Sequence, residues 1–397
     1  MNLAAILTTA AERHPDRPAL KLDDVELTYA GLDEGSARVA RLLSDRGVAA
    51  GDRVGVMLPN VPYFAACYYG VLRAGGVVVP MNVLLKDREV EFYLADSGAK
   101  LLFAWHDFGD AAEKGAQAAG AECVLVKPGE FERLLAGVEP LTELADRADD
   151  DTAVILYTSG TTGKPKGAEL THRNLTRNVE VVNDMFGFDE RTVTLGALPL
   201  FHSFGQTCAL NATIRAGGCV TFIPRFDAAK ALEIIERDKV RVFEGVPTMY
   251  AGMLHVEDRE RYDTSTLELC VSGGAAMPGE ILRGFEEAFG CKVLEGYGLS
   301  ETSPVASFNH PDRERKVGSI GTPIEGVEMK VVDDDGNEVP RGEVGEIVIR
   351  GHNVMKGYWN RPDATQEAID ADGWFGPATW PRWTRRATSS SSTARRS

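Results

Sequence analysis

Short apolar runs alternate with longer amphipathic segments through the first third of the chain. The runs have the length of strands, and the segments between them repeat their apolar positions at the period of an α-helix. Alternation of strands and helices is typical of a mainly parallel, helix-covered sheet, so the pattern predicts an α/β fold. The predicted strands cover residues 53–58, 76–79, 100–103 and 123–126, and the predicted helices cover residues 63–73 and 87–95.

The alternation continues in the middle of the chain. Residues 152–156 are apolar and predict a buried strand, and the charged stretch 143–151 before them suggests a linker. Asp227 is placed to cap a helix that extends to Glu236, because an Asp side chain can accept hydrogen bonds from the first N–H groups of a helix. Residues 241–244 then resume a strand. The middle of the chain therefore extends the α/β pattern.

The pattern changes from Gly318 onward. Residues 328–332 and 346–350 alternate apolar and polar side chains with the period of two that strands show. They are joined through Asp334-Asp335-Gly336, a combination that favours a turn between antiparallel strands. We therefore expect an antiparallel, barrel-like part over about residues 318–375.

Composition limits the range of functions. The chain has 397 residues, of which 44% are hydrophobic, so it can bury a core larger than that of a single small domain. Its formal net charge of −16 argues against binding to nucleic acid or to an anionic membrane surface, because both would repel it at long range. A negatively charged ligand must then be met by a local cluster of positive groups.

The cysteines and the apolar segments favour a cytoplasmic protein. No two cysteines have the spacing of paired metal ligands, and each lies among apolar or small residues, so we expect reduced thiols in the core. The longest apolar stretch, residues 61–72, is too short to span a bilayer, and the N-terminal residues show no signal-peptide pattern. The cysteines are Cys67, Cys123, Cys208, Cys219, Cys270 and Cys291.

Residues 157–167 concentrate phosphate-binding chemistry after the strand predicted at 152–156. Their glycines free the backbone so that successive N–H groups can point toward one anion. Their hydroxyls add uncharged donors, their lysines add mobile positive charge, and Pro165 prevents a helix. The segment predicts a nucleotide-binding loop whose candidate ligands are Thr158, Ser159, Gly160, Thr161, Thr162, Gly163, Lys164 and Lys166.

Two other interpretations of this loop are weaker. A Walker A loop has four residues between its glycines and continues as Gly-Lys-Ser/Thr, whereas Gly160 and Gly163 are separated by two residues and Lys164 precedes a proline. A flexible surface loop rich in Gly and Thr seldom follows an apolar strand with two lysines in place.

The loop resembles the signature of the adenylate-forming superfamily, which contains acyl-CoA synthetases, firefly luciferase and the adenylation domains of peptide synthetases. Four further segments match motifs of this family in the same order. Several motifs in one order are far more specific than any one of them, and the resemblance covers roughly residues 1–375. The segments are residues 199–205, 245–250, 272–276 and 297–302, the last being Tyr-Gly-Leu-Ser-Glu-Thr.

The resemblance implies a fold and a reaction. The family has two α/β subdomains with helix-covered, mainly parallel sheets and a distorted β-barrel, followed by a small hinged α+β domain that we expect to be missing here. Its members use ATP and Mg²⁺ to convert a carboxylate into an acyl-adenylate and pyrophosphate, and a thiol such as that of CoA then displaces AMP. The resemblance therefore implies ATP, Mg²⁺, CoA and a small carboxylic acid as ligands, and it is compatible with a homodimer.

The resemblance also assigns roles to single residues. Glu301 would be the magnesium ligand, in keeping with the preference of Mg²⁺ for one or two carboxylates beside phosphate oxygens. Thr302 would bond the α-phosphate and Tyr297 would stack on the adenine. Without the resemblance, Glu301 could be a solvated carboxylate and Tyr297 an ordinary core aromatic. Further nucleotide contacts are implied at Gly273, Gly274, Ala275, Glu295, Gly296 and Gly298.

His202 lies in an apolar setting, and the family places an aromatic residue or a histidine there, near the reacting carboxylate. We expect it to position the acid or gate its pocket, although an isolated histidine in such a setting is more often structural. The segments that would line the acid pocket contain no Arg or Lys, which favours an apolar monocarboxylic acid such as a fatty acid. The implied pocket residues are Phe201, His202, Phe204, Gln206, Val246, Pro247, Thr248 and Met277.

Residues 376–397 depart from the family pattern. They contain five arginines and no acidic residue, and they stand where the family continues as Arg-Thr-Gly-Asp-Leu, whose aspartate binds the ribose. Back-translation in a neighbouring reading frame restores that pattern through most of the tail, so we expect a frameshift near residue 376 and a disordered tail. A chain without the ribose aspartate and the lysine of the C-terminal domain would be impaired in adenylation.

Three functions remain open from the sequence. The first is an AMP-forming acyl-CoA ligase whose catalytic residues would be Thr158, Lys164, His202, Glu301 and Thr302. The second is an adenylation enzyme that loads an acid onto a carrier protein, which independence of free CoA would reveal. The third is a nucleotide- or acyl-binding protein without turnover, which would bind ATP without exchanging pyrophosphate.

Overall fold

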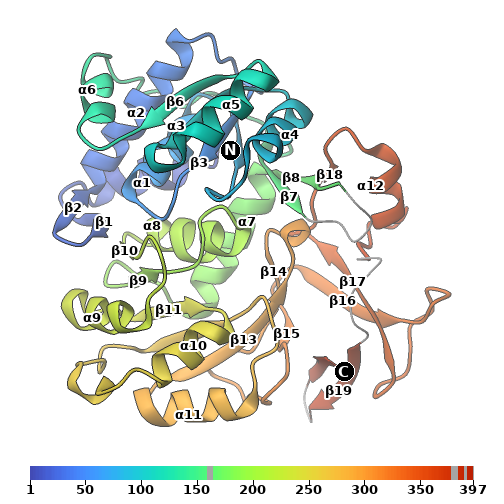
Figure 1. Ribbon diagram of the computed structural model, residues 1–397. Helices are drawn as coiled ribbons and strands as arrows, with labels where there is room; N and C mark the ends of the chain where they lie inside the picture. The colour runs from blue at the N-terminus through green and yellow to red at the C-terminus, as the bar shows by residue number, and fades with distance from the viewer. Residues whose placement is uncertain (159–163, 377–382, 389–390, 397) are drawn as a thin grey trace.

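The computed structural model describes residues 1–158 and 164–376, together with the backbone of residues 383–388 and 391–396. A seven-stranded sheet and a nine-stranded sheet form the two halves of the body, and a smaller antiparallel sheet lies beside them (Figure 1). Helices cover both faces of the two large sheets. The α/β class with two helix-covered, mainly parallel sheets is therefore confirmed.

The seven-stranded sheet has the order β18-β8-β7-β4-β3-β5-β6. The strands from β7 to β6 pair in parallel, whereas β8 and β18 are added antiparallel. The four runs predicted as early strands all lie here. The bounds are β3 (Arg53–Met57), β4 (Val77–Pro80), β5 (Ala99–Trp105), β6 (Glu122–Val126), β7 (Thr152–Thr158), β8 (Lys166–Thr171) and β18 (Gly357–Tyr358).

Both faces of the parallel part of this sheet are buried, because alternate side chains of each strand enter two different cores. Val54 and Phe103 belong to the main core on the side of α2 and α3, whereas Val79 and Leu102 belong to a second core beneath α4 and α5. The helices of this half are α2 (Tyr29–Asp45), α3 (Pro62–Arg73), α4 (Asp87–Ser97), η1 (His106–Phe108), α5 (Gly109–Ala119) and α6 (Glu130–Ala136).

The nine-stranded sheet has the order β15-β14-β13-β12-β11-β9-β10-β1-β2. Its strands from β13 to β1 pair in parallel, and the edge strands β2, β14 and β15 are antiparallel. The bounds are β1 (Pro18–Leu22), β2 (Val25–Thr28), β9 (Val193–Gly196), β10 (Cys219–Phe222), β11 (Val242–Gly245), β12 (Leu269–Ser272), β13 (Lys292–Gly298), β14 (Val305–Phe308) and β15 (Thr322–Pro323).

The two faces of this sheet carry different sets of helices. One face is covered by α9, α10 and α11, and Asp227 caps α9 as predicted by accepting a 2.9 Å hydrogen bond from the Lys230 N–H. The other face is covered by α7, η2 and α8. The bounds are α1 (Ala5–Arg13), α7 (His172–Phe186), η2 (Gly205–Asn211), α8 (Ala212–Arg215), α9 (Ala228–Asp238), α10 (Pro247–Leu254), η3 (Arg259–Arg261), α11 (Gly279–Phe289) and η4 (Ser300–Thr302).

The antiparallel texture expected after Gly318 is confirmed, with differences in detail. β16 (Val327–Val332) and β17 (Val344–Gly351) pair antiparallel. The predicted turn at Asp334-Asp335-Gly336 is present, because the Asp333 N–H donates to the Asn337 carbonyl at 2.9 Å and Val332 forms an antiparallel bridge with Glu338; residues 339–343 then lead into β17. β18 leaves this part and joins the seven-stranded sheet through β8, and α12 (Pro362–Ala368) follows it.

Within the tail, the structure describes two backbone segments, and both are strands. β19 (Trp383–Thr388) pairs with β17, and β20 (Ser391–Arg396) pairs with β19, both antiparallel. A free edge of β17 would present unpaired backbone groups, and β19 satisfies them there.

Residues 143–151 are not a linker between domains. The strand that follows them, β7, joins the same sheet as the strands that precede them. The stretch is also fixed to its surroundings, since the Ala145 N–H donates to the Arg73 carbonyl at 2.9 Å and the Asn2 side chain donates to the Ala145 carbonyl at 3.0 Å. Its charges mark a surface loop within one folded body.

The cysteines are reduced, as the sequence predicted, and five of the six are buried. Cys123 is the exception, because its side chain on the edge strand β6 is half-buried. Among the described residues, no helix is long and apolar enough to cross a membrane.

His172, the first residue of α7, ties the N-terminal segment to the core. Its Nδ1 accepts a 2.9 Å hydrogen bond from the Leu3 N–H, and its side chain is fully buried. Burial, and after it the charge of Arg147, lowers the pKa of the His172 imidazole to about 4. The folded protein therefore favours the neutral form of the His172 imidazole.

Acid should weaken the fold through His172. In the unfolded chain its pKa is about 6.5, so its contribution to stability is complete above that pH and is lost as the pH falls toward 4. The expected loss is roughly 3 kcal/mol at pH 4. Urea unfolding between pH 7 and 4 should show a shallower decline for His172→Asn, whose side-chain oxygen can still accept from Leu3. An unchanged pH dependence in this variant would contradict the assignment.

Candidate active site

Four of the predicted motifs lie at one edge of the nine-stranded sheet. β9, β11, β12 and β13 run parallel, so their carboxyl ends share an edge. The family-like segments identified from the sequence, residues 199–205, 245–250, 272–276 and 297–302, lie at the ends of these strands and just after them. Segments far apart in the chain are therefore brought together by strand direction alone.

The topology reverses at this edge between β9 and β11. The chain continues from β9 into η2 and α8 on one face, whereas it continues from β11 into α10 on the other face. Open α/β sheets bind their ligands outside the carboxyl ends of the strands at such a reversal. The fold thus places the segments around His202 and Val246 where a ligand site is expected.

The predicted phosphate loop connects β7 and β8 of the other large sheet. Thr158 and Lys166 face each other as the last described pair of this hairpin. Ser159, Gly160, Thr161, Thr162 and Gly163 lie outside the described residues, and Lys164 beside them is exposed. The base of the hairpin is rigid, because Tyr157 stacks on Tyr93 with ring centroids 4.5 Å apart and donates to the Asp96 carboxylate at 2.8 Å.

Glu301 meets this hairpin from the nine-stranded sheet. It lies in η4, directly after β13, and its Oε1 accepts hydrogen bonds from the Tyr358 hydroxyl at 2.9 Å and from the Thr158 hydroxyl at 3.4 Å. Its backbone carbonyl accepts from the Met355 N–H at 2.8 Å. The two sheets and the segment around β18 therefore converge on one carboxylate.

Tyr358 is a site residue that the sequence did not reveal. β18 pairs with β8, with Tyr358 opposite Ala168, and this register aims its hydroxyl at Glu301. The Lys166 ammonium lies over the Tyr358 ring at 5.0 Å from the centroid, which is a favourable cation–π distance. Burial, and after it the charge of Glu301, raises the pKa of Tyr358, so the phenol stays protonated and donates.

The donor set around Glu301 fits a magnesium ion shared with phosphates. No group of three or more His, Cys, Asp and Glu side chains within the described ranges could hold a metal by itself. One carboxylate beside a hydroxyl is instead what Mg²⁺ uses when phosphate oxygens and water complete its shell. Glu301, with Thr158 beside it, is thus the residue that would hold the ion.

Thr302, which was predicted to bond the α-phosphate, bonds within the turn that carries Glu301. Its side chain is fully buried, and its hydroxyl accepts from the Leu299 N–H at 2.8 Å and donates to the Pro304 carbonyl at 2.5 Å. These bonds close the turn that carries Glu301. A direct bond from Thr302 to a phosphate would require one of them to break.

The same turn is held from two further sides. The Thr207 hydroxyl in η2 donates to the Ser303 carbonyl at 3.0 Å, and the Ser303 hydroxyl donates to the Asn353 carbonyl at 2.8 Å. Glu301 therefore stands on a turn whose neighbours are fixed by buried hydrogen bonds, as a preorganised ligand requires.

The residues predicted to surround the adenine lie at the end of β13, and two of them have structural partners. Glu295 is buried, and its carboxylate accepts a 2.9 Å hydrogen bond from the Gly318 N–H. Burial raises the pKa of Glu295, although its backbone donors oppose the shift. A Cβ at Gly296 would overlap the Phe308 ring, so this glycine allows close packing. Tyr297, the next residue of β13, is half-buried.

The segment after β12 lies against the segment after β9. A Cβ at Gly273 would come within 2.8 Å of the Phe204 ring, so the glycine admits that ring. Gly274 has a φ of +75°, a conformation that side chains rarely adopt, and Ala275 beside it is exposed. Backbone is thus accessible here, as the predicted approach to a base requires.

His202 is accessible to solvent, yet surrounding protein lowers the pKa of its imidazole through desolvation. The Phe201 ring lies against it, with centroids 4.5 Å apart. A neutral imidazole in a partly dry setting suits the positioning role predicted for His202.

The residues predicted to line the acid pocket differ in burial and in their contacts. Val246 and Pro247 are half-buried and Thr248 is exposed at the start of α10. Gln206 is fully buried, and its amide donates to the Leu200 carbonyl at 2.8 Å. Met277 packs into the core beneath α10 and α11 instead of facing the segment around His202, because Met277 is among the apolar residues of that core.

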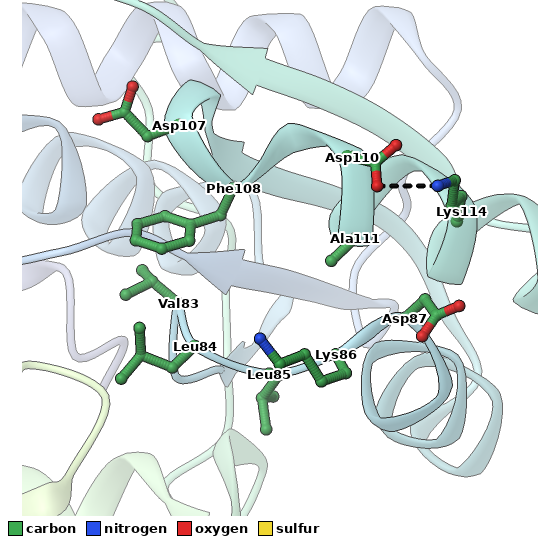
Figure 2. Close-up of a pocket in the computed structure, with 10 residues that line it drawn as sticks. All are labelled: Val83, Leu84, Leu85, Lys86, Asp87, Asp107, Phe108, Asp110, Ala111 and Lys114. Carbon is green, nitrogen blue, oxygen red and sulfur yellow. Dashed lines mark hydrogen bonds and ion pairs between the residues drawn. The ribbon is translucent and has the colours of Figure 1, made fainter.

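A separate cavity of about 390 Å³ opens on the seven-stranded sheet, between the segment after β4 and the start of α5 (Figure 2). Val83, Leu84 and Phe108 lie along one side of it, and the Lys114 ammonium pairs with Asp110 at 2.8 Å on the other. It contains none of the predicted site residues.

Comparison with known proteins places these observations in context. The model of the AMP-binding enzyme family matches residues 7–359. A long-chain-fatty-acid–CoA ligase of Bacillus subtilis (strain 168) is 35% identical over 94% of this chain and 73% of its own length. A feruloyl-CoA synthase of an Amycolatopsis species is 37% identical over 92% of this chain and 73% of its own length.

Solved structures agree in fold. ATP-bound MatB from Rhodopseudomonas palustris superposes with a TM-score of 0.91 at 32% identity, covering 100% of this chain and 78% of that one. The inhibitor-bound N-terminal domain of FACL13 from Mycobacterium tuberculosis gives a TM-score of 0.90 at 30% identity, covering 100% of this chain and 99% of that domain. The 397 residues therefore correspond in extent to that domain.

Proposed function

Because the chain belongs to the AMP-binding enzyme family, we propose that it activates a monocarboxylic acid with ATP and transfers the acyl group to CoA. The relatives include acyl-CoA ligases, which supports acid activation and transfer to CoA as the general chemistry. A fatty acid is our first candidate for the acid, since long-chain-fatty-acid–CoA ligases are among the relatives and the expected pocket segments contain no Arg or Lys.

One observation carries the proposal. The base of the phosphate-binding hairpin, the Glu301 turn and Tyr358 come from three separate parts of the chain and meet at one carboxylate. A carboxylate held in this position can bind a cation whose shell is completed by phosphate oxygens and water. Attack of a carboxylate on the α-phosphorus needs alignment and charge neutralisation more than acid–base help.

The described residues supply these requirements in the following way. Glu301 would hold Mg²⁺, which neutralises phosphate charge when bound. Lys166, whose ammonium rests on the Tyr358 ring, places positive charge at the mouth of the hairpin together with Lys164. Thr158 adds a hydroxyl donor, Thr302 fixes the turn under Glu301, and His202 positions the acid without acting as a base.

The proposal is tested by acid-dependent exchange of labelled pyrophosphate into ATP, followed by acyl-CoA formation. We expect exchange that requires both a monocarboxylic acid and Mg²⁺, and thioester formation that requires free CoA. Exchange without use of CoA would favour the alternative of loading a carrier protein. ATP binding without any exchange would contradict the proposal and favour a binding protein.

We propose that the 397 residues by themselves are less active than a longer polypeptide that contains them. The curated relatives extend beyond the matched region, since it spans 73% of their length. We expect the 397 residues alone to adenylate slowly and to complete little transfer to CoA. Turnover in the usual range of enzymes, about 1–1000 per second, from these residues alone would contradict this expectation.

We propose a cytoplasmic location, because all six cysteines are free thiols and such thiols persist in reducing compartments. For the assembly we propose a homodimer, on the family resemblance alone. Light scattering coupled to size exclusion would report a monomer mass if that part is wrong.

A further inference from the structure

Glu244 in β11 is a buried carboxyl group without a partner. Its side chain is fully buried, and within the described residues neither Oε1 nor Oε2 has a hydrogen-bond partner. Leaving both oxygens of a carboxyl unpaired away from water is costly, and native proteins seldom do so without a functional reason. Nothing in the fold or in the chemistry described above uses this group.

The strand pattern shows which way Glu244 points. Its neighbour Phe243 enters the core beneath α9, α10 and α11, so Glu244 faces the opposite side of the sheet. Its cross-strand partner there is Val271, which belongs to the main core on the side of η2. Cys208 of η2 belongs to the same main core as Val271, so the carboxyl lies in the layer between β11 and that helix.

This layer adjoins the candidate acid site. Glu244 is one residue from the end of β11, on the strand that borders the topological reversal, and Gly245 and Val246 of the site edge follow it directly. η2 begins directly after the segment that carries His202 and Phe204, and it is a π-helix, a form that is frequent at functional sites. Gln206 in η2 also has a buried side-chain oxygen without a partner among the described residues.

We propose that Glu244 is a specificity-determining residue of the acid site and that it accepts a hydrogen bond from a hydroxyl or amino substituent carried by the acid. The proposal rests on the proposed function and deepens it, because it narrows the acid from a plain apolar one to one with a polar substituent. A site that holds a buried polar group rejects an analogue without the matching substituent, since the group is then left unpaired.

The ionisation of Glu244 agrees with this assignment. Burial raises its pKa to about 8, so at neutral pH the carboxyl is largely uncharged. An uncharged carboxyl can accept from a hydroxyl and donate back to it. The alkyl amino group of an acid such as ω-aminooctanoate can instead take up the proton and form an ion pair. An aromatic amine is too weak a base for this and only donates a hydrogen bond, so the alkyl amine is the test of charge.

The test compares matched acids that differ in one substituent. Octanoate, ω-hydroxyoctanoate and ω-aminooctanoate form one set, and benzoate with its para-hydroxy and para-amino derivatives forms another. Binding of each acid to the full 397-residue chain is measured by calorimetry, and pyrophosphate exchange is measured in parallel. The variants are Glu244→Met, Glu244→Gln and, as a matched control on an exposed glutamate, Glu257→Gln.

We expect the unaltered chain and Glu257→Gln to favour a substituted acid over the plain one by about tenfold to hundredfold in at least one set. Glu244→Met should remove this preference, and its melting temperature should not fall, because an unpaired carboxyl is replaced by an apolar group. Glu244→Gln should keep the preference for the hydroxy-substituted acid over the plain acid. It should lose the preference for ω-aminooctanoate over octanoate, so the variant separates the two substituents.

The outcomes distinguish this inference from the function on which it rests. Equal binding of plain and substituted acids by the unaltered chain, or an unchanged preference in Glu244→Met, would overturn the role of Glu244 even if exchange is observed. A preference that disappears in Glu244→Met while no acid supports exchange would uphold the role of Glu244 and remove the proposed ligase activity. If Glu244→Met does not fold, the isosteric Glu244→Gln decides the question through the amino-substituted acid.

Discussion

Replacement of Glu301 by glutamine is expected to lower kcat/KM for pyrophosphate exchange by about a hundredfold to a thousandfold. The amide keeps the size of the side chain and an oxygen that can accept from Tyr358 and Thr158, so the turn should remain in place. What is lost is the negative charge that would hold Mg²⁺ against the phosphates. The apparent Mg²⁺ requirement should therefore rise together with the loss of rate.

Two companion variants make this result specific. Glu367→Gln makes the same change at an exposed position on α12 and should leave exchange unaltered. Tyr358→Phe removes the 2.9 Å bond but keeps the ring that supports Lys166, and it should cost less than Glu301→Gln. If exchange by Glu301→Gln stays within a few fold of the unaltered chain at low Mg²⁺, Glu301 is not the metal ligand.

Gly298→Ala is expected to lower the free energy of unfolding markedly. Gly298 ends β13, and a Cβ there would overlap the carbonyl oxygen of Pro304, which is backbone and cannot swing aside. Overpacking of this kind typically costs 1–3 kcal/mol, and a clash with backbone belongs at the upper end, so we expect roughly 3 kcal/mol. The turn between Gly298 and Pro304 carries Glu301, so exchange should fall as well.

The matched control is Gly284→Ala in α11. There a Cβ would lie 3.7 Å from a Leu254 methyl group, an ordinary contact, and alanine favours a helix over glycine by up to about 1 kcal/mol. Urea unfolding should therefore move in opposite directions for the two variants. A urea midpoint for Gly298→Ala close to that of the unaltered chain would contradict the prediction. It would show that the turn can move away from β13 without loss of stability.

The sequence predicted the parallel strands of the seven-stranded sheet, because they are buried on both faces and stand out as apolar runs between helices. Of the nine-stranded sheet it predicted only β11. β1 and β2 were among the strands missed, because residues 18–28 contain no long apolar run. Their pairing with β10 depends on residues far along the chain.

The site was harder to predict where side-chain partners decide the role. The sequence did not predict a role for Tyr358, because β18 has only two residues. Its orientation depends on pairing with β8, a strand nearly half the chain away. Thr302 was assigned to a phosphate by its motif, but its hydroxyl closes a turn. Glu244 was placed correctly in a strand, yet no periodicity could show that its carboxyl would be buried without a partner.

The first strand of the chain has a consequence for synthesis. Leu20 in β1 pairs with Val220 in β10, so β1 leaves the ribosome long before the neighbour that completes its sheet. At 5–20 residues per second, the wait is on the order of tens of seconds. During that time the apolar face of β1 and α1 lacks its permanent cover. Chaperone contact with the nascent N-terminal segment is therefore expected to end only when β10 has emerged. Ribosome-bound nascent chains of increasing length would show the chain length at which the chaperone is released.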